Sequence, residues 1–235
     1  MLENIIECCA NSIKSALTAI QAGANRIELC ANLEEGGITP KFKDIIKLRE
    51  FTKVNLHILI LPNPNKFIYN QNEFNKIIND IKRCKEIGCN GIVIGALNQD
   101  YSINIKQTKK MVKTARPMKV TFHRSFDVAN KLKENIEDVI ACGCDYLLTS
   151  GQAPSVEQGI ENLKKIIKLS NHRIKVLAGG GVNHKNIKFL YEIGIREFHL
   201  SGTKRNNEGV LETTFKNISQ AVKELQKIEK NIVLD

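Results

Sequence analysis

The chain has 235 residues, of which 42% are hydrophobic and 26% are charged, and its formal net charge is +10. This balance excludes a disordered chain, and no apolar run approaches the roughly 20 residues that a membrane-spanning helix needs. The positive charge is spread along helical segments such as NLKKIIKL, and without Trp and with only four Tyr the chain offers few rings for base stacking, so nucleic-acid binding is not expected.

Short runs of β-forming residues alternate along the chain with segments of helical periodicity. The predicted strands cover residues 5–9, 26–29, 55–60, 91–95, 119–123, 146–149, 175–178 and 197–200. The predicted helices cover residues 12–22, 42–51, 73–87, 105–115, 132–142, 156–169, 186–193 and 214–230. Ser12 and Asn186 are typical helix-start residues, and glycines in IGCNG, CGCDY and IGIRE are placed to end helices. Strict alternation predicts a parallel sheet with helices outside it.

Eight such units without a leftover segment favour a single (β/α)8 TIM barrel over residues 1–235, in the α/β class, with an open doubly wound sheet as the alternative. The length is close to the ~250 residues typical of this barrel. We see no linker or shift in composition, so one domain is expected. Functional residues of such barrels lie at the C-terminal ends of the strands, where the βα loops gather.

The seven cysteines are interpreted as reduced thiols. Their number is odd, the chain is large, and its start, MLENIIECCANS, lacks the basic and apolar regions of a signal peptide, so a cytoplasmic location is expected. The CxC of Cys142 and Cys144 and the CxxxxC of Cys84 and Cys89 lack the matching second pair of a structural zinc site.

The first two strands each end in a Glu-x-Cys pattern. Glu7 and Cys9 share one face of the first strand, and Glu28 and Cys30 share one face of the second. If both faces point into the barrel, the thiols could form a soft site for Cu(I) and the carboxylates could serve acid–base chemistry. Free cysteines are more often small buried hydrophobic residues, whereas an inward glutamate needs a partner or a task.

The fifth strand ends in TFHRSFD, which brings three ionisable groups to one strand end. His123 is a candidate general base or metal ligand, Arg124 is a candidate anion-binding residue, and Asp127 completes the group. The alternative is an Arg124–Asp127 pair that only holds the loop together.

The seventh and eighth strands lead into glycine-rich segments, which in this fold often bind phosphate through backbone N–H groups. The candidate anion-binding residues are Gly179, Gly180, Gly181, Ser201 and Gly202. His199 is a further candidate metal ligand, although a single histidine at a strand end is often a hydrogen-bonded structural residue.

These segments resemble the CutC copper homeostasis family over most of the chain. The similarity rests on residues 7–16 and 23–30 (GANRIELC), on EGGITP at 35–40, on Phe67-x-Tyr69, on TFHRSFD at 121–127, on LTSG at 148–151 and on GGGV at 179–182. The resemblance implies a (β/α)8 barrel, a cytoplasmic setting, a tendency to dimerise and an association with copper tolerance.

The chain departs from the family pattern at two places. After the third strand, where the family usually reads IRPR, this chain reads ILPN, so Leu61 and Asn63 replace two arginines. If those arginines hold an anionic group, either the ligand differs here or Arg124 has a larger part in binding. Asn104 also stands where the family tends to carry Asp.

Two hypotheses therefore stand side by side. The first is a copper-handling protein that binds Cu(I) through Cys9 and Cys30, with His199 as a third ligand. The second is an enzyme that acts on a small anionic or phosphorylated metabolite, with Glu7, Glu28 and His123 as acid–base residues. The enzyme is favoured because a metal carrier does not need two carboxylates, a histidine, Arg124 and glycine-rich segments at one site. The family resemblance favours copper.

Overall fold

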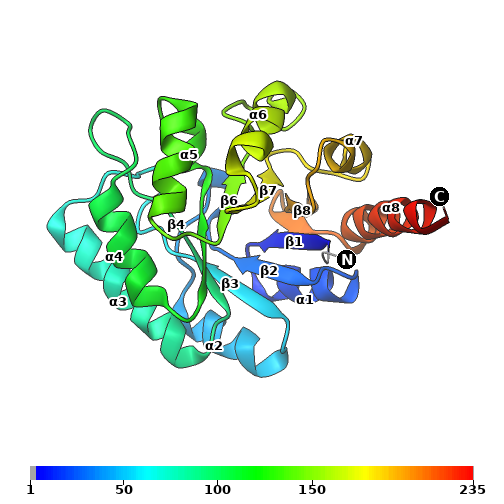
Figure 1. The fold of residues 1–235 in the computed structure, drawn as a ribbon. Helices are drawn as coiled ribbons and strands as arrows, with labels where there is room; N and C mark the ends of the chain where they lie inside the picture. Colours follow the sequence, from blue (N-terminus) through cyan, green and yellow to red (C-terminus); the bar gives the residue numbers. More distant parts are fainter. Residues whose placement is uncertain (1–3, 235) are drawn as a thin grey trace.

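Eight parallel strands form one closed barrel in the computed structural model, which describes residues 4–234 and side chains as far as residue 231 (Figure 1). The strands are β1 Ile5–Ala10, β2 Arg26–Leu29, β3 Asn55–Leu59, β4 Gly91–Ile94, β5 Lys119–Phe122, β6 Tyr146–Thr149, β7 Lys175–Gly179 and β8 Glu197–Leu200. They neighbour one another in chain order, and β8 pairs with β1. The predicted (β/α)8 barrel is confirmed, and the open doubly wound sheet is excluded.

A helix follows each strand and lies outside the barrel (Figure 1). The helices are α1 Ile13–Gln21, α2 Phe42–Phe51, α3 Gln71–Ile87, α4 Ile105–Ala115, α5 Leu132–Ala141, α6 Ile160–Ser170, α7 Ile187–Glu192 and α8 Phe215–Leu234. Helix α8 packs against α1 and β1 and so closes the outer ring next to the N-terminal strand. No helix within residues 4–234 combines the length and the apolar character that crossing a membrane requires.

The structure differs from the sequence-based expectation mainly in the loops at the barrel mouth. Two short 3-10 helices, η1 Leu33–Glu35 and η2 Arg124–Val128, follow β2 and β5. A hairpin of β9 Thr203–Arg205 and β10 Leu211–Thr213 precedes α8, so the chain does have a segment beyond the eight units. Helix α6 begins at Ile160 and not at residue 156. Strands of three residues are too short for a periodic pattern to reveal them.

The register of the strands decides which side chains face the barrel interior. Glu7 lies opposite Arg26 of β2 and opposite His199 of β8, and Cys9 lies opposite Glu28. Since side chains alternate along a strand, these residues share the inner face, while Cys8 points to the opposite side. All seven cysteines are free and buried, in agreement with the expectation of reduced thiols.

Candidate functional site

A cavity of about 500 Å³ opens at the C-terminal ends of the strands, where the fold predicts a site. Its walls come from the ends of the strands and from the loops after β2, β3, β5, β7 and β8. Of the residues singled out from the sequence, those that line it are Cys9, Glu28, Leu61, Phe67, His123, Arg124, Asp127, Gly180, Gly181, His199 and Ser201. Glu7, Cys30, Gly179 and Gly202 are not among the lining residues.

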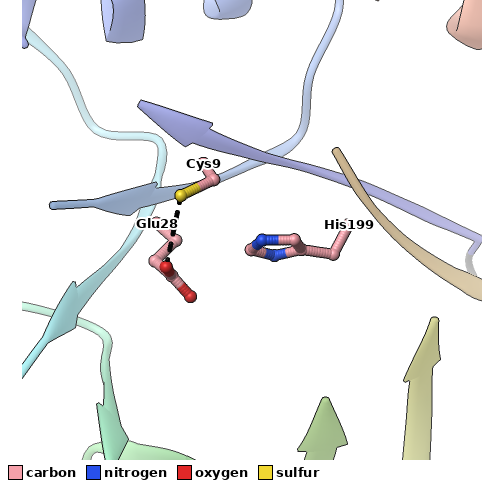
Figure 2. Close-up of side chains that lie close together, drawn as sticks. All are labelled: Cys9, Glu28 and His199. Carbon is pink, nitrogen blue, oxygen red and sulfur yellow. Dashed lines mark hydrogen bonds between the residues drawn. The ribbon is translucent and has the colours of Figure 1, made fainter. Parts of the chain in front are cut away.

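The deep part of the cavity contains three residues from three neighbouring strands, Cys9 of β1, Glu28 of β2 and His199 of β8 (Figure 2). One donor atom of each lies within 4.8 Å of the other two. The Cys9 thiol donates to Oε1 of Glu28 over 3.4 Å, and Oε2 of Glu28 has no hydrogen-bond partner among the described residues. A thiol, a carboxylate and an imidazole therefore meet in one buried cluster.

Below this cluster, a chain of ion pairs fills the barrel interior. Glu7 bonds to His199 through one oxygen and to the guanidinium of Arg26 through the other. Arg26 bonds in turn to Glu197 over 2.7 Å, and Lys175 pairs with Glu197 over 3.2 Å at the opposite end of the barrel. Arg26 is 1% exposed and Glu7 is fully buried. These contacts fix the side chains that form the base of the cavity.

The two carboxylates have opposite environments. Burial alone would raise the pKa of Glu7, but the positive charge of Arg26 and the hydrogen bond and charge of His199 outweigh it and hold the pKa well below its usual range. Burial raises the pKa of Glu28, and the negative charge of Glu7 adds to this effect against the opposing charge of His199. Glu7 is therefore a permanent carboxylate, whereas Glu28 is the one that can hold a proton.

His199 is oriented by Glu7, and the neighbouring carboxylates favour its charged form. Its Nδ1 atom lies 2.6 Å from Oε1 of Glu7, which leaves Nε2 as the free ring nitrogen. Burial favours the neutral ring, but the charge of Glu28 and the hydrogen bond and charge of Glu7 raise its pKa. A carboxylate that orients one histidine nitrogen and leaves the other free is a common arrangement for both general acid–base catalysis and metal ligation.

The thiols of Cys9 and Cys30 lie close together, with 3.6 Å between their sulfur atoms. The hydrogen bond to Cys30 and burial raise the pKa of Cys9 well above its usual value. The distance between the sulfurs is within the span of two metal–thiolate bonds of about 2.3 Å each. Thiolates are ligands that Cu(I) prefers, so this pair of thiols fits a copper ion, provided that binding displaces the protons. Cys30 is not part of the group of Cys9, Glu28 and His199 whose donor atoms lie within 4.8 Å of one another, so the structure does not bring both thiols and His199 together.

His123 lies on the β5 side of the cavity and is 4% exposed. Its Nδ1 atom accepts a hydrogen bond from the backbone N–H of Ser125, while Nε2 has no partner among the described residues. Burial lowers its pKa to about 4, so the ring is neutral at physiological pH.

Arg124 and Asp127 follow at the cavity rim. Arg124 donates to Asp127 over 2.7 Å and to the Ser150 hydroxyl over 2.9 Å. Asp127 also accepts hydrogen bonds from the Thr149 hydroxyl and from the backbone N–H groups of Ser150 and Gln152. This pattern is that of a carboxylate holding two loops together, as in the alternative interpretation of the pair. Within the described residues, Arg124 is the single arginine or lysine on the cavity wall.

The glycine-rich segments divide between binding and packing positions. Gly180 lies beside Arg124, because a Cβ atom built on it would lie 3.2 Å from Cζ of Arg124 and 3.0 Å from Cβ of Ser150. Its φ angle is +109°, a conformation that other residues rarely adopt. A Cβ atom built on Gly179 would lie 2.6 Å from the Leu148 side chain, and one built on Gly202 would lie 2.5 Å from the Ile218 side chain. These two glycines therefore leave room for neighbouring apolar side chains to pack.

Several residues of the barrel interior were not predicted from the sequence. His57 is fully buried, with no hydrogen bond to either ring nitrogen among the described residues and with Nδ1 3.9 Å from Oε2 of Glu7, and Glu197 binds Arg26. Glu197 could have been found, because it is two residues before His199 and therefore shares its strand face. Nothing in the sequence distinguished His57 from an outward-facing strand residue.

The two departures from the family pattern after β3 have separate consequences. Leu61 is 2% exposed and lines the cavity, so an apolar side chain stands where the resemblance implies an arginine. Asn63 donates to Glu73 over 3.2 Å and is not among the residues that line the cavity. The positive charge at the rim therefore rests on Arg124.

Comparisons with known proteins agree with these features. A model described as the CutC family matches residues 4–204. A CutC family protein of Bacteroides fragilis is 40% identical over 212 residues, which is 89% of this chain and 84% of that protein. One from Chromobacterium violaceum is 39% identical over 201 residues, covering 85% and 81%. The crystal structure of a Streptococcus agalactiae protein named for copper homeostasis, CutC, has a TM-score of 0.80 at 26% identity and covers 84% of this chain and 98% of that chain.

Proposed function

The chain belongs to the CutC family, and from the construction of its barrel cavity we propose that it is an enzyme acting on a small anionic metabolite by acid–base chemistry. Glu28 and His199 are the proposed proton-transfer residues. Glu7 orients His199, and Arg124 with the backbone at Gly180 binds the anionic group.

The size and lining of the cavity support a ligand larger than a metal ion. A volume of about 500 Å³ falls within the range of roughly 300–1,000 Å³ found for small-molecule sites. The wall combines apolar side chains such as Leu59 and Val93 with a few polar groups, which is typical of sites that fix the orientation of a metabolite. Arg124 offers the one fixed positive charge on that wall within the described residues.

The observation that carries the proposal is the contrast between Glu7 and Glu28. Two carboxylates whose surroundings move their pKa values in opposite directions are typical of acid–base sites, because one stays ionised while the other holds a proton more readily. Glu28 also keeps one oxygen without a partner among the described residues, at the base of the cavity. His199, held through Nδ1 by Glu7, can accept or donate a proton through Nε2.

The test combines binding with proton exchange. Small carboxylates and monophosphates are screened by thermal shift and calorimetry against the wild type, Glu28→Gln and the exposed control Glu212→Gln. Compounds that bind are then incubated with the protein in D2O, and exchange of their carbon-bound hydrogens is followed by NMR. We expect binding and exchange in the wild type and control and loss of exchange in Glu28→Gln. Equal exchange in all three proteins, or no compound that binds, would reject the proposal.

A second candidate function is Cu(I) binding, favoured by the 3.6 Å separation of the Cys9 and Cys30 sulfurs. Copper is here the cargo, held by the two thiolates. The copper homeostasis name of the Streptococcus agalactiae relative points the same way. We further propose a cytoplasmic setting, where free thiols such as these stay reduced.

Anaerobic Cu(I) titration with a competing chelator tests this candidate. We expect one tight equivalent in the wild type and its loss in the Cys9→Ser, Cys30→Ser double variant. Cys8→Ser is the matched control, because Cys8 adjoins Cys9 but points away from the site, toward the carbonyl of Ser201. Unchanged binding in the double variant would show that these thiols do not hold the ion.

A further inference from the structure

We propose that His123 and Ser125 form an uncharged subsite in the cavity that binds a carbonyl or hydroxyl oxygen of the ligand. The inference rests on the proposed function and narrows its substrate class to small anions that also carry an oxo or hydroxy group. It assigns His123 the role of a neutral hydrogen-bond donor rather than a base or a metal ligand.

The tautomer of His123 follows from its hydrogen bonding. The backbone N–H of Ser125 donates to Nδ1 over 3.1 Å, so Nδ1 carries a lone pair and not a proton. A neutral ring then has its proton on Nε2, and the charged ring would lose this contact because both its nitrogens are donors. Burial lowers the pKa of His123 to about 4, which agrees with a ring that stays neutral. Nε2–H is therefore a donor and cannot accept a proton or coordinate a metal in this form.

The Nε2–H group is buried in the cavity wall without an acceptor. His123 is 4% exposed, and Nε2 has no partner among residues 4–231. The hydroxyl of Ser125 lines the same cavity and is also unpartnered in that part of the chain. Buried polar groups are nearly always hydrogen-bonded, so two adjacent exceptions on the wall of one cavity indicate groups that a ligand satisfies.

The surrounding backbone is built around these two side chains. A Cβ atom on Gly95, directly after β4, would lie 2.4 Å from Cε1 of His123 and 2.4 Å from Oγ of Ser125. The Phe67 ring packs at 5.1 Å from the imidazole in a tilted arrangement. The ring of His123 is therefore confined by its neighbours, as a recognition group should be.

The subsite lies in the same cavity as the positive charge of Arg124, and this combination determines which ligands fit. Arg124 stands between His123 and Ser125 in the chain and extends to the rim beside Gly180. Arg124 and His123 line the same cavity, so one ligand can place its anionic group on Arg124 and an oxygen on His123. Uncharged donors recognise oxo and hydroxy groups without requiring a second negative charge, and a site built for such a group strongly rejects an analogue that lacks it.

Two probes of equal chain length test the inference, dihydroxyacetone phosphate and propyl phosphate. Calorimetry is performed with the wild type, His123→Phe, Ser125→Ala and the control His172→Gln, which lies between α6 and β7 at the opposite end of the barrel. Nitrogen-15 NMR of the imidazole rings reports the tautomer of His123 in the unliganded protein. Ser125→Ala removes only a hydroxyl and serves if His123→Phe does not fold.

We expect the Nε2–H tautomer at pH 7 and at least tenfold tighter binding of dihydroxyacetone phosphate than of propyl phosphate in the wild type and the control. His123→Phe should bind propyl phosphate as the wild type does but lose the preference for dihydroxyacetone phosphate. Ser125→Ala should keep this preference in a weaker form. A ring protonated on Nδ1, or equal binding of both probes by the wild type, overturns the subsite alone. If neither probe binds the wild type, the anionic-ligand proposal fails and the subsite with it.

Discussion

His199 and Glu7 are 192 residues apart in the chain, yet Nδ1 of His199 lies 2.6 Å from Oε1 of Glu7. They meet because β8 pairs with β1 where the barrel closes, and the two residues stand opposite each other in that register. Glu7 also bonds to Arg26, so the orientation of His199 depends on an ion pair in the interior of the barrel. The pairing of β8 with β1 that closes the barrel therefore also brings together the residues of the site.

Glu7→Gln should weaken both the fold and the orientation of His199. The substitution preserves shape but leaves the buried Arg26 with Glu197 as its remaining carboxylate. Removing one partner of a buried ion pair typically costs about 3–5 kcal/mol, and we expect a loss in the free energy of unfolding of that order. The pKa of His199 should fall as well, since Glu7 contributes to its elevation. Chemical denaturation and NMR titration measure the two effects.

Glu212→Gln provides the matched control. Glu212 pairs with Lys14 over 3.0 Å, but the two side chains are 34% and 75% exposed. Exposed pairs contribute about 0–1 kcal/mol, so this variant should be nearly as stable as the wild type. Equal losses in the two variants would show that the buried network is not the support assigned to it.

The alternation of strands and helices was enough to predict the barrel and its eight strands, each within one residue of its observed ends. Alternation also predicted that Glu7 and Cys9 share one face of the first strand and that Glu28 and Cys30 share one face of the second. In the structure Cys9 lies opposite Glu28 and both line the cavity, whereas Cys30 follows the end of β2 and does not line it. A period-two pattern depends only on local sequence, which explains why these predictions hold.

The contacts between strands could not be derived in the same way. Register and closure depend on the whole barrel, so the pairing of Glu7 with Arg26 and His199 needed the structure. The role of Asp127 was left open for the same reason, because its partners Thr149 and Gln152 come from the next strand and loop.

Gly180→Ala should lower stability and ligand binding at the cavity rim more than an alanine substitution at another glycine with a positive φ angle. Gly209 is the matched control, because its φ angle is +78° and a Cβ atom there would contact nothing within 4 Å. Gly209→Ala should cost about 1 kcal/mol through its backbone conformation alone. At Gly180, with φ at +109°, the added methyl group also meets Ser150 and Arg124. We expect a larger loss of stability and at least tenfold weaker binding of propyl phosphate, measured by denaturation and calorimetry.

Asp127→Ala should separate the loops after β5 and β6. It removes the acceptor for Arg124, for the Thr149 hydroxyl and for the N–H groups of Ser150 and Gln152. Leaving buried donors without acceptors costs about 1–3 kcal/mol for each group, so a loss of at least 2 kcal/mol is expected. Asp100→Ala, which removes the two hydrogen bonds that exposed Asp100 accepts from Ser102, should cost less than Asp127→Ala because these groups can bond to water instead. Similar stabilities of the two variants would contradict a structural role for Asp127.

The final prediction concerns pH and the buried histidines. Burial lowers the pKa of His123 to about 4, against a usual value near 6.5. As pH falls below 6.5, the unfolded chain binds a proton on this ring while the folded protein does not, so the folded state loses stability until the pH reaches about 4. Between pH 6.5 and 5 the loss amounts to about 2 kcal/mol. His57, whose pKa burial also lowers to about 4, contributes in the same direction.

Comparison of variants isolates the contribution of His123, because other groups titrate nearby. His199, with a raised pKa, stabilises the folded state as pH falls toward 6.5 and adds nothing further below that value. Glu28, also raised, opposes the loss as it gains its proton. Both effects are common to the wild type and His123→Phe, so the difference in unfolding free energy between them should shrink by about 2 kcal/mol from pH 6.5 to 5. Urea denaturation at several pH values measures it, with His172→Gln as the control that should follow the wild type. A difference independent of pH would mean that His123 takes up its proton in the folded protein as readily as in the unfolded chain, which contradicts a ring held neutral by burial.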